Sequence, residues 1–187
     1  LEAEAAGGVS TPATQDAAWV TSKQHPWRRA EGDGRVRDGD LVVLSAGVLA
    51  DGYVAEVART LVVGEPTEAV TALYRRRDEL WDRLVAACRP GATTSTLLDA
   101  YQQAGEALPA MPVAHGLGLV FDPPVVSPGL RATAETDVLE QGMVLALTAY
   151  VWEQGVGAVL TRDAVLITAE GAEILSTVPA YGEAVHG

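Results

Sequence analysis

A serine, a glutamate and two of the three histidines have the side chains that a hydrolytic site needs. Ser45 is the candidate nucleophile, and Glu56 is the acid that would orient a base. The base itself would be His25 or His115. The sequence has no G-x-S-x-G segment to expose a nucleophilic serine, so only composition supports a serine hydrolase. Glu56 with a histidine is the better candidate for acid–base chemistry.

The single cysteine, Cys88, is the other possible nucleophile. It falls on the apolar stripe of a predicted helix, so we expect it to pack in the core. The sequence contains no C-x-x-C or H-E-x-x-H metal motif. The glycines of "GDGR" and "GLGL" lack the strand and helix that flank a phosphate-binding loop.

Composition limits the class of protein. The chain has 187 residues, of which 48% are hydrophobic, enough for the core of one domain. A formal net charge of -12 argues against electrostatic binding to nucleic acid or to an anionic membrane. No apolar run approaches the roughly 18 residues of a membrane span, so we expect a cytoplasmic protein without nucleic-acid or membrane partners. Leu1 is not an initiator methionine, and we expect the chain to be part of a longer one.

The positions of these residues depend on two predicted strand pairs. "GDLVVLSAG" and "GYVAEVART" are β-branched segments around Asp51-Gly52, the typical sequence of a hairpin with a tight turn. The segments "MVLALTAYVW" and "GAVLTRDAVLIT" predict a second pair. His25 precedes the first hairpin in a charged, turn-rich loop.

Two helices are predicted between the strand pairs. In residues 66–88 apolar side chains recur at steps of three and four, and Pro90-Gly91 would end the helix. A second helix is expected from Thr94 or Ser95 to Pro109. Strands, helices and strands in this order indicate an α+β fold, with helices on one face of a curved antiparallel sheet.

Two segments are assigned less regular roles. The run "RRRDE", residues 75–79, is interpreted as the solvent-exposed face of the first helix, with a binding patch as the alternative. Residues 127–142, "SPGLRATAETDVLEQG", are predicted to form a loop.

A series of motifs resembles the pita-bread domain of the creatinase, prolidase, aminopeptidase P and methionine aminopeptidase family. They are the two strands of the first hairpin, then "ACRPG", "AHGLGL", "GMVLALTAY" and "LTRDAVLIT". The similarity extends from Trp19 to Pro179 and implies the family's fold. That domain has a longer N-terminal half, so we expect residues 1–40 to be an incomplete remnant of it with the entry loop. Residues 41–187 would be the C-terminal half of the same single domain.

The resemblance also implies where a metal site would lie. Metallopeptidases of the family hold two metal ions with two aspartates, one histidine and two glutamates. The corresponding positions here carry, in order, Ser45, Glu56, His115, Thr148 and Arg162. The family's spacing is kept, with a step of eleven residues from the first position to the second and of fourteen from the fourth to the fifth. The residue types are mostly not metal ligands, so we expect no metal and no other cofactor.

Charge leads to the same expectation. The family's four carboxylates offset two dications, whereas here Glu56 supplies one negative charge and Arg162 adds a positive one. Two unit charges about 4 Å apart interact by roughly 4 kcal/mol at an effective dielectric near 20, so a guanidinium would repel a neighbouring metal. We expect Arg162 to pair with Glu56 or Asp163, because a buried arginine needs a partner; anion binding is the alternative.

Three other positions are assigned through the resemblance. His115 precedes Gly116 and Gly118, which would let the backbone turn closely, and it is either a hydrogen-bonded core histidine or a catalytic one. His25 resembles a histidine of the substrate site. Asp122 stands where the family has a second substrate-binding histidine, and this difference disfavours peptidase chemistry.

We therefore predict a non-catalytic relative of the Xaa-Pro aminopeptidases and creatinases, with a binding or regulatory role. Its ligand would be a small molecule, a peptide-like molecule or a protein partner, with Arg162 or His115 contacting a carboxylate. The alternative is a metal-free, creatinase-like C–N hydrolase that uses Glu56 and a histidine. An atypical Xaa-Pro peptidase is a third possibility. Uncovered apolar surface would favour a homodimer.

Overall fold

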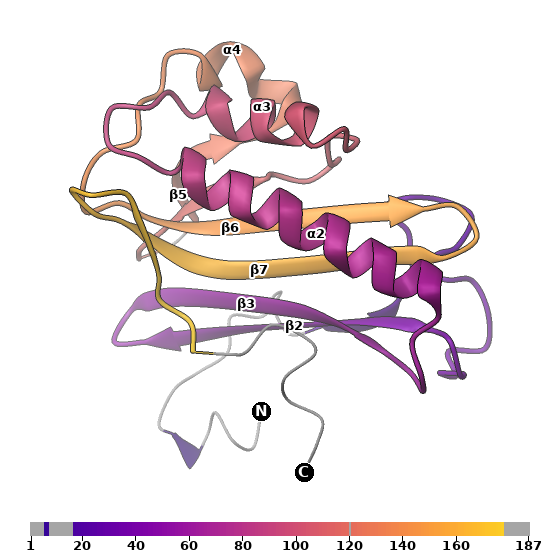
Figure 1. The fold of residues 1–187 in the computed structure, drawn as a ribbon. Coiled ribbons are helices and arrows are strands. Elements are labelled where there is room, and N and C mark those ends of the chain that lie inside the picture. Colours follow the sequence, from indigo (N-terminus) through magenta and orange to yellow (C-terminus); the bar gives the residue numbers. More distant parts are fainter. Residues whose placement is uncertain (1–5, 8–16, 120, 178–187) are drawn as a thin grey trace.

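One antiparallel sheet forms the centre of the protein (Figure 1). The computed structural model describes residues 6–7, 17–119 and 121–177. Within them the sheet has eight strands in the order β1-β2-β3-β7-β6-β4-β5, and β8 pairs with β7. The strands are β1 (Ala17–Val20), β2 (Leu41–Ala50), β3 (Tyr53–Val62), β4 (Ala114–Leu117), β5 (Phe121–Val126), β6 (Val144–Glu153), β7 (Gly157–Ile167) and β8 (Ala172–Ile174).

The β2–β3 hairpin is confirmed with its turn at Asp51 and Gly52. Their φ values of 50° and 86° are the left-handed values that a tight hairpin turn of this kind requires. This turn fixes a register in which Ser45 lies opposite Ala58 and Gly47 lies opposite Glu56. Because side chains alternate along a strand, Glu56 and Ala58 share one face of the sheet.

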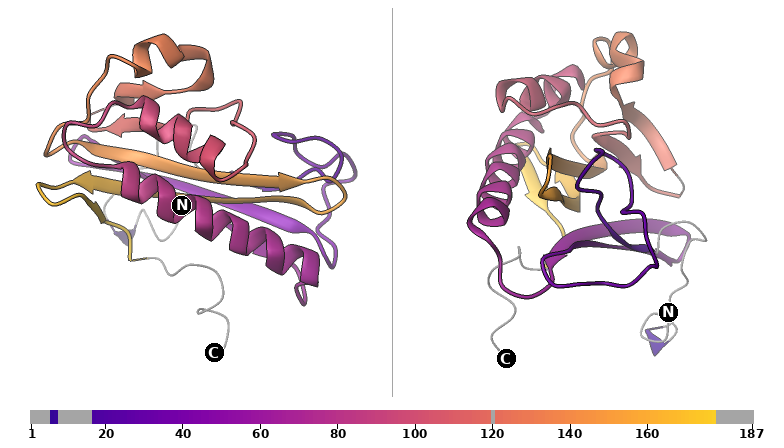
Figure 2. Two further views of the ribbon diagram at one scale, coloured as in Figure 1. Left: turned by 45° about the horizontal axis from the view of Figure 1, so that its top comes forward. Right: turned by 90° about the vertical axis from the view of Figure 1, so that its right-hand side faces the viewer.

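Helix α2 (Glu68–Ala87) covers one part of this sheet. It begins at Thr67, whose side chain accepts a hydrogen bond of 3.3 Å from the Val70 N–H. Its apolar stripe includes Leu73, Leu80 and Leu84, all fully buried. Figure 1 shows α2 crossing in front of β6 and β7, whereas no described helix lies in front of β2 and β3. Figure 2 shows the same layer from two further directions.

The second predicted helix is shorter than expected. Helix α3 (Ser95–Gln103) begins at the predicted place but ends before Pro109. Gly105 follows it with a left-handed φ of 73°, and the N–H groups of Gly105 and Glu106 donate to the carbonyls of Gln102 and Tyr101. These two hydrogen bonds cap the C-terminus of α3, as is common where a glycine with a left-handed φ follows the helix.

The predicted loop at residues 127–142 is also partly helical. It contains the short 3-10 turn η1 (Pro128–Leu130) and the single-turn helix α4 (Arg131–Ala134). Pro128 is the first residue of the 3-10 turn. An N–H at that position makes no hydrogen bond within the helix, so proline is tolerated there.

The interpretation of residues 75–79 as a solvent-exposed face is wrong for Arg77. Arg75 is exposed, but Arg77 is only 3% exposed. Arg77 lies four residues after Leu73 and three before Leu80, so it continues the buried stripe of α2. The periodicity of the helix, rather than the charge of the run, determines which way this side chain points.

Cys88 packs in the core at the end of α2, as expected. It is fully buried, and this burial raises the pKa of the thiol to about 12. A thiol with such a pKa is a poor nucleophile. No described helix is long and apolar enough to cross a membrane.

Candidate functional site

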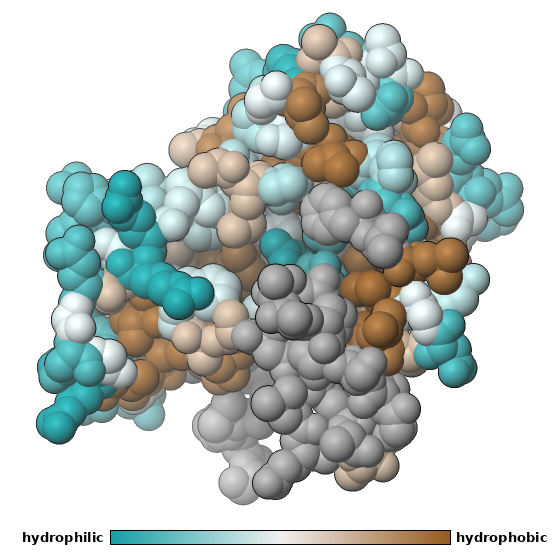
Figure 3. Space-filling view, turned by 180° about the vertical axis from the view of Figure 1, so that it is seen from behind, coloured by the Kyte–Doolittle hydropathy of each residue, from teal (hydrophilic) through white to brown (hydrophobic). Residues whose placement is uncertain are grey.

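Four of the five predicted site residues come from four neighbouring strands. Glu56 is on β3, Arg162 on β7, Thr148 on β6 and His115 on β4. Arg162 pairs directly with Thr148 on one side and with Ala58 on the other. Residues that pair directly across strands project to the same face, so this register brings the side chains together on the face opposite α2. Figure 3 views the molecule from that side, where apolar and hydrophilic side chains are mixed.

Arg162 is the centre of this cluster. Its Nη1 donates to Glu56 Oε2 at 2.9 Å, and its Nε donates to Thr148 Oγ1 at 2.9 Å. The ion pair is largely buried, with side-chain exposures of 18% for Arg162 and 4% for Glu56. The expectation that Arg162 pairs with Glu56 is confirmed, whereas Asp163 faces the other side of the sheet and pairs with Arg59.

The third nitrogen of Arg162 has a weaker partner. Its Nη2 lies 3.6 Å from the sulfur of Met111, which is a weak hydrogen-bond acceptor. Arg162 and Met111 both line a cavity of about 240 Å³. The Arg162 guanidinium therefore contacts the buried Glu56 carboxylate through one nitrogen and lines this cavity on its other side.

His115 completes the cluster on the other side of Glu56. Its Nε2 lies 3.2 Å from Glu56 Oε1, and the side chain is buried. An ionised carboxylate only accepts hydrogen bonds, so Nε2 carries the proton in this contact. Gly116 and Gly118 allow the strand to approach Asp122 and Pro123, because a side chain at either glycine would clash with them. The close turn expected after His115 is thus confirmed.

The charges around Glu56 favour its ionised form. Burial acts to raise the pKa of Glu56, but the His115 hydrogen bond and the positive charge of Arg162 outweigh it, so the pKa lies below the usual 4.5. The carboxylate is therefore ionised at neutral pH. Its two oxygens are engaged by different partners, Oε1 by His115 and Oε2 by Arg162.

Ser45 lies outside this network. It is on β2, opposite Ala58, and among the described residues no hydrogen bond joins it to Glu56, His115 or Arg162. It instead lines the 240 Å³ cavity together with Arg162. The structure places no histidine beside it in that cavity, within the described part of the chain.

A second cavity, of about 410 Å³, is lined by Glu56 itself. It opens where β3 and β7 diverge, since these strands pair only at Ala58–Arg162 and Arg59–Thr161. Its lining is mostly aliphatic, including Val54, Leu117 and Ala164. Glu56 is its one ionisable lining residue among those described.

His25 and Asp122 are not part of the cluster. His25 is exposed and lines a separate cavity of about 260 Å³, formed by its own loop and the start of β2. Asp122 lies on β5, opposite Gly116 of β4. Neither residue lines the 240 Å³ cavity at Arg162 or the 410 Å³ cavity at Glu56. Their assignment to a substrate site stays a prediction.

Comparisons with known proteins identify the family. The model of metallopeptidase family M24 matches residues 1–169. The chain belongs to metallopeptidase family M24. A Xaa-Pro dipeptidase of Pyrococcus furiosus is 32% identical over 152 residues, which are 77% of this chain and 42% of that relative. The chain therefore spans less than half the length of this M24 relative.

Solved structures of M24 proteins have the same fold. The prolidase from Pyrococcus furiosus matches with a TM-score of 0.74 and 28% identity, over 91% of this chain and 51% of that one. The prolidase from Pyrococcus horikoshii matches with a TM-score of 0.76 and 26% identity, over 95% and 51%. A methionine aminopeptidase from Thermotoga maritima, at 21% identity and a TM-score of 0.69, shares the fold alone. The pita-bread fold and its curved antiparallel sheet are thus confirmed.

The metal ions that the M24 family implies do not suit these side chains. A dinuclear site needs several anionic oxygens, and this cluster offers one carboxylate and one imidazole. Both oxygens of that carboxylate already accept hydrogen bonds, and the Arg162 guanidinium is directly beside it. Among the described residues no group of three or more His, Cys, Asp or Glu side chains could hold a metal.

Residues that were not predicted also surround the cluster. Trp19, Arg29 and Met111 line the 240 Å³ cavity, and the Tyr101 hydroxyl donates to the Thr148 carbonyl at 2.9 Å. Trp19, Arg29 and Tyr101 lie outside the motifs, and Met111 precedes "AHGLGL" by three residues, so the motifs themselves did not indicate them. Tyr101 was detectable only as an apolar position of the second helix.

Proposed function

We propose that this chain is a non-catalytic member of family M24 in which the metal site has been replaced by a ligand-binding pocket. The observation that carries the proposal is the position of Arg162, with one nitrogen on Glu56 and another beside the 240 Å³ cavity. A guanidinium supplies there the positive charge that holds the remaining carboxylate. It also lacks any means of activating water as a Lewis acid would.

The ligand that this pocket suits best is a small or peptide-like molecule with a carboxylate. Nη2 of Arg162 has only a thioether sulfur as its described acceptor, so a carboxylate would gain a stronger bond there. Arg29 lines the same cavity and adds a second positive charge, and Trp19 offers an apolar wall. A peptide-like molecule with one free carboxylate matches both features.

A metal and activity assay tests the loss of catalysis. We expect the purified protein to carry substoichiometric manganese, cobalt or zinc and to leave Xaa-Pro dipeptides intact, with and without added metal. The variant Ser45→Asp/Thr148→Glu/Arg162→Glu restores carboxylates at three positions and should gain metal binding in calorimetry. Stoichiometric metal with dipeptide hydrolysis in the unaltered protein would refute the proposal.

A binding assay tests the pocket. Titration with an Xaa-Pro dipeptide should give saturable heat, and Arg162→Met should weaken binding about tenfold or more, the loss expected for a charge-assisted contact. Arg131→Met is the matched control, because that side chain is 42% exposed, pairs with Asp99 and lines neither cavity at the cluster. Equal affinities for the Arg162→Met variant and the unaltered protein would contradict this assignment.

A second candidate function is a metal-free, creatinase-like C–N hydrolase. The 3.2 Å contact between Glu56 and His115 favours it, because a histidine oriented by a carboxylate can transfer a proton. A creatine hydrolysis assay without metal tests it, and turnover that is lost in His115→Gln would support it over the binding protein. A homodimer, a protein partner and a cytoplasmic location stay predictions.

A further inference from the structure

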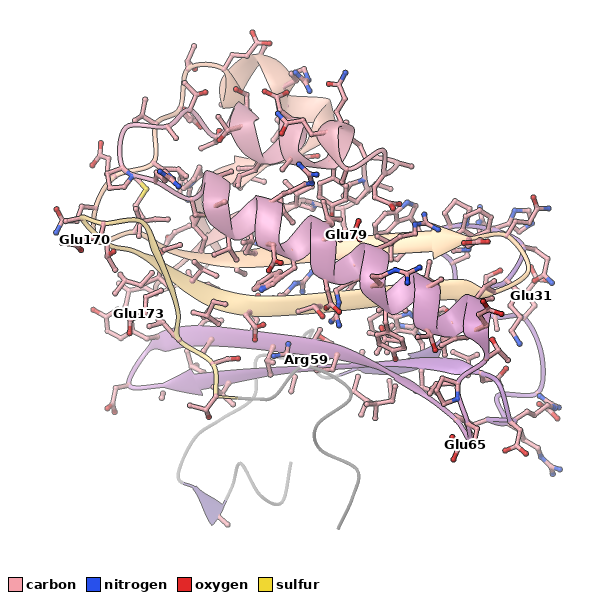
Figure 4. The ribbon with its side chains drawn as sticks, in the orientation of Figure 1. Glu31, Arg59, Glu65, Glu79, Glu170 and Glu173 are labelled. Atoms are coloured by element: carbon pink, nitrogen blue, oxygen red, sulfur yellow. The ribbon has the colours of Figure 1, made fainter. Side chains whose placement is uncertain are left out.

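A second buried arginine, Arg77, lines a cavity on the opposite face of the sheet. This Arg77 cavity has a volume of about 260 Å³ and lies between α2, β3, β7 and the end of β8. Arg59, labelled in Figure 4, is on the side of the sheet that carries α2 and contributes to the same lining. The remaining lining residues that matter here are Trp81, Thr161, Asp163 and Ile174.

Arg77 is incompletely satisfied by the described residues. Its Nη1 donates to the Thr161 hydroxyl. Its Nε and Nη2 are buried and have no hydrogen-bond acceptor in the part of the chain that the structure describes. Asp78 Oδ1 is 2.7 Å from Nη2, but this ion pair lies outside hydrogen-bonding geometry, and the Asp78 side chain is 58% exposed. A buried charged donor without an acceptor is costly and rare in folded proteins.

The neighbouring residue of the same helix shows what this edge of a guanidinium binds. Arg76 directs its Nε and Nη2 to the two oxygens of Glu106, each at 2.8 Å. This side-on arrangement is the bidentate geometry in which arginine holds a carboxylate. The same two nitrogens are the ones that lack acceptors in Arg77.

The carboxylate already present in the Arg77 cavity has other partners. Asp163 Oδ1 accepts hydrogen bonds from Arg59 Nη2 at 2.8 Å and from the Ser176 hydroxyl at 2.5 Å. Two guanidinium groups thus share one buried carboxylate, with the exposed Asp78 beside them. Burial, followed by repulsion from Arg59, lowers the pKa of Arg77 against the opposing attraction of Asp78. The lining balances two arginines, Arg59 and Arg77, with two aspartates, so Arg77 is distinguished by its unfilled hydrogen-bonding capacity and not by a net charge of the cavity.

We propose that the Arg77 cavity binds the carboxylate of a small organic anion, which displaces the exposed Asp78 side chain from Nη2 and is held side-on by Nε and Nη2 of Arg77. Trp81 and Ile174 provide apolar walls for the rest of the molecule, so an aromatic or branched carboxylate fits better than acetate. This site is separate from the pocket at Arg162, because Arg162 of β7 projects to one face of the sheet and Arg77 of α2 lies against the other. It does not depend on the function proposed for that pocket.

Benzoate is a suitable probe, with sodium acetate and sodium chloride at equal ionic strength as comparisons. Benzoate should raise the melting temperature of the whole chain saturably, acetate less, and chloride not at all. Arg77→Leu should weaken benzoate binding about tenfold or more, the effect of losing a bidentate charged contact. Arg75→Leu removes the same charge from the exposed face of α2 and should bind as the unaltered protein does.

Two further variants keep the result decisive. Arg77→Lys retains the charge but cannot hold a carboxylate side-on, so it should also bind benzoate more weakly and covers the case in which Arg77→Leu does not fold. Arg162→Met should leave benzoate binding at Arg77 unchanged, which separates this site from the other pocket. No saturable benzoate effect, or an effect that survives in Arg77→Lys, would overturn the proposal.

Discussion

Two arginines on opposite faces of one strand, the partly buried Arg162 and the buried Arg77, differ in how their charge is satisfied. Arg162 projects from β7 on the face opposite α2 and donates to both Glu56 and Thr148. Arg77 reaches the neighbouring residue of β7, Thr161, from the other face; that hydroxyl is its described hydrogen-bond acceptor, and the exposed Asp78 is its ion-pair partner. The same side chain therefore stabilises a cluster where a carboxylate is in place and creates an acceptor-poor cavity where it is not.

The largest expected effect is the loss of the Arg162–Glu56 pair. Arg162→Met would leave the Glu56 carboxylate buried without its cation, and the free energy of unfolding should fall by about 3 kcal/mol. Urea denaturation measures this change. In a cycle with Glu56→Gln, the double variant should lose less than the sum of the two single losses.

The exposed pair Asp33–Arg37 is the control for this cycle. Its side chains are 49% and 62% exposed, and removing either should change stability by no more than about 0.5 kcal/mol. An Arg162 variant as stable as the Arg37 variant would show that the central pair contributes nothing beyond a surface contact.

Removing Arg77 should raise the free energy of unfolding, whereas removing Arg162 should lower it. Arg77→Leu replaces a buried, incompletely satisfied cation on an otherwise apolar stripe, so the free energy of unfolding should rise by about 2 kcal/mol in the absence of carboxylates. Arg75→Leu, on the exposed face of α2, should change it by less than about 0.5 kcal/mol. A marked loss of stability in Arg77→Leu would mean that Arg77 has native partners after all, and the contrast with Arg162 would disappear.

A smaller effect is expected at Thr161, the one described acceptor of Arg77. Thr161→Val should lower the free energy of unfolding by about 1 kcal/mol in the unaltered protein, because Nη1 then loses its hydrogen bond. In the Arg77→Leu background the same change should cost nothing. Equal costs in both backgrounds would show that the hydroxyl acts independently of the arginine.

The smallest expected effect is the decrease in the free energy of unfolding at acid pH that is due to Glu56. The pKa of Glu56 in the folded protein is lower than the usual 4.5, so its contribution is complete above that value and is lost as the pH falls through the lower folded pKa. Urea midpoints measured from pH 6 downward should therefore decrease. In Glu56→Gln this part of the decrease should be absent, whereas Arg77→Leu should keep it.

Much of the architecture could be predicted from local sequence. The Asp51-Gly52 turn and the two β-branched runs specify the β2–β3 hairpin, and the stripe of Leu73, Leu80 and Leu84 specifies α2. The end of α3 was also visible in principle, because Gly105 is a helix-ending residue that the predicted extension to Pro109 overlooked. Local steric and hydrogen-bonding preferences act over a few residues, so these elements follow from short segments.

The sequence by itself also determined which residues occupy the site positions. The family resemblance assigned Glu56, His115, Thr148 and Arg162 to these positions, and charge predicted that Arg162 pairs with Glu56 or Asp163, of which the structure has Glu56. Only the tertiary structure decided that Ser45 lies outside the network, because Ala58 of β3 lies between Ser45 and Arg162 across the sheet.

The fate of Arg77 was likewise decided by the tertiary structure. Its place on the apolar stripe was readable from the period of α2, but its shortage of acceptors depends on side chains that come from β3 and β7. A residue's type and local spacing determine where it can point. Whether its charge is satisfied there depends on which distant strands meet it, and that is fixed only when the sheet and the helix pack together.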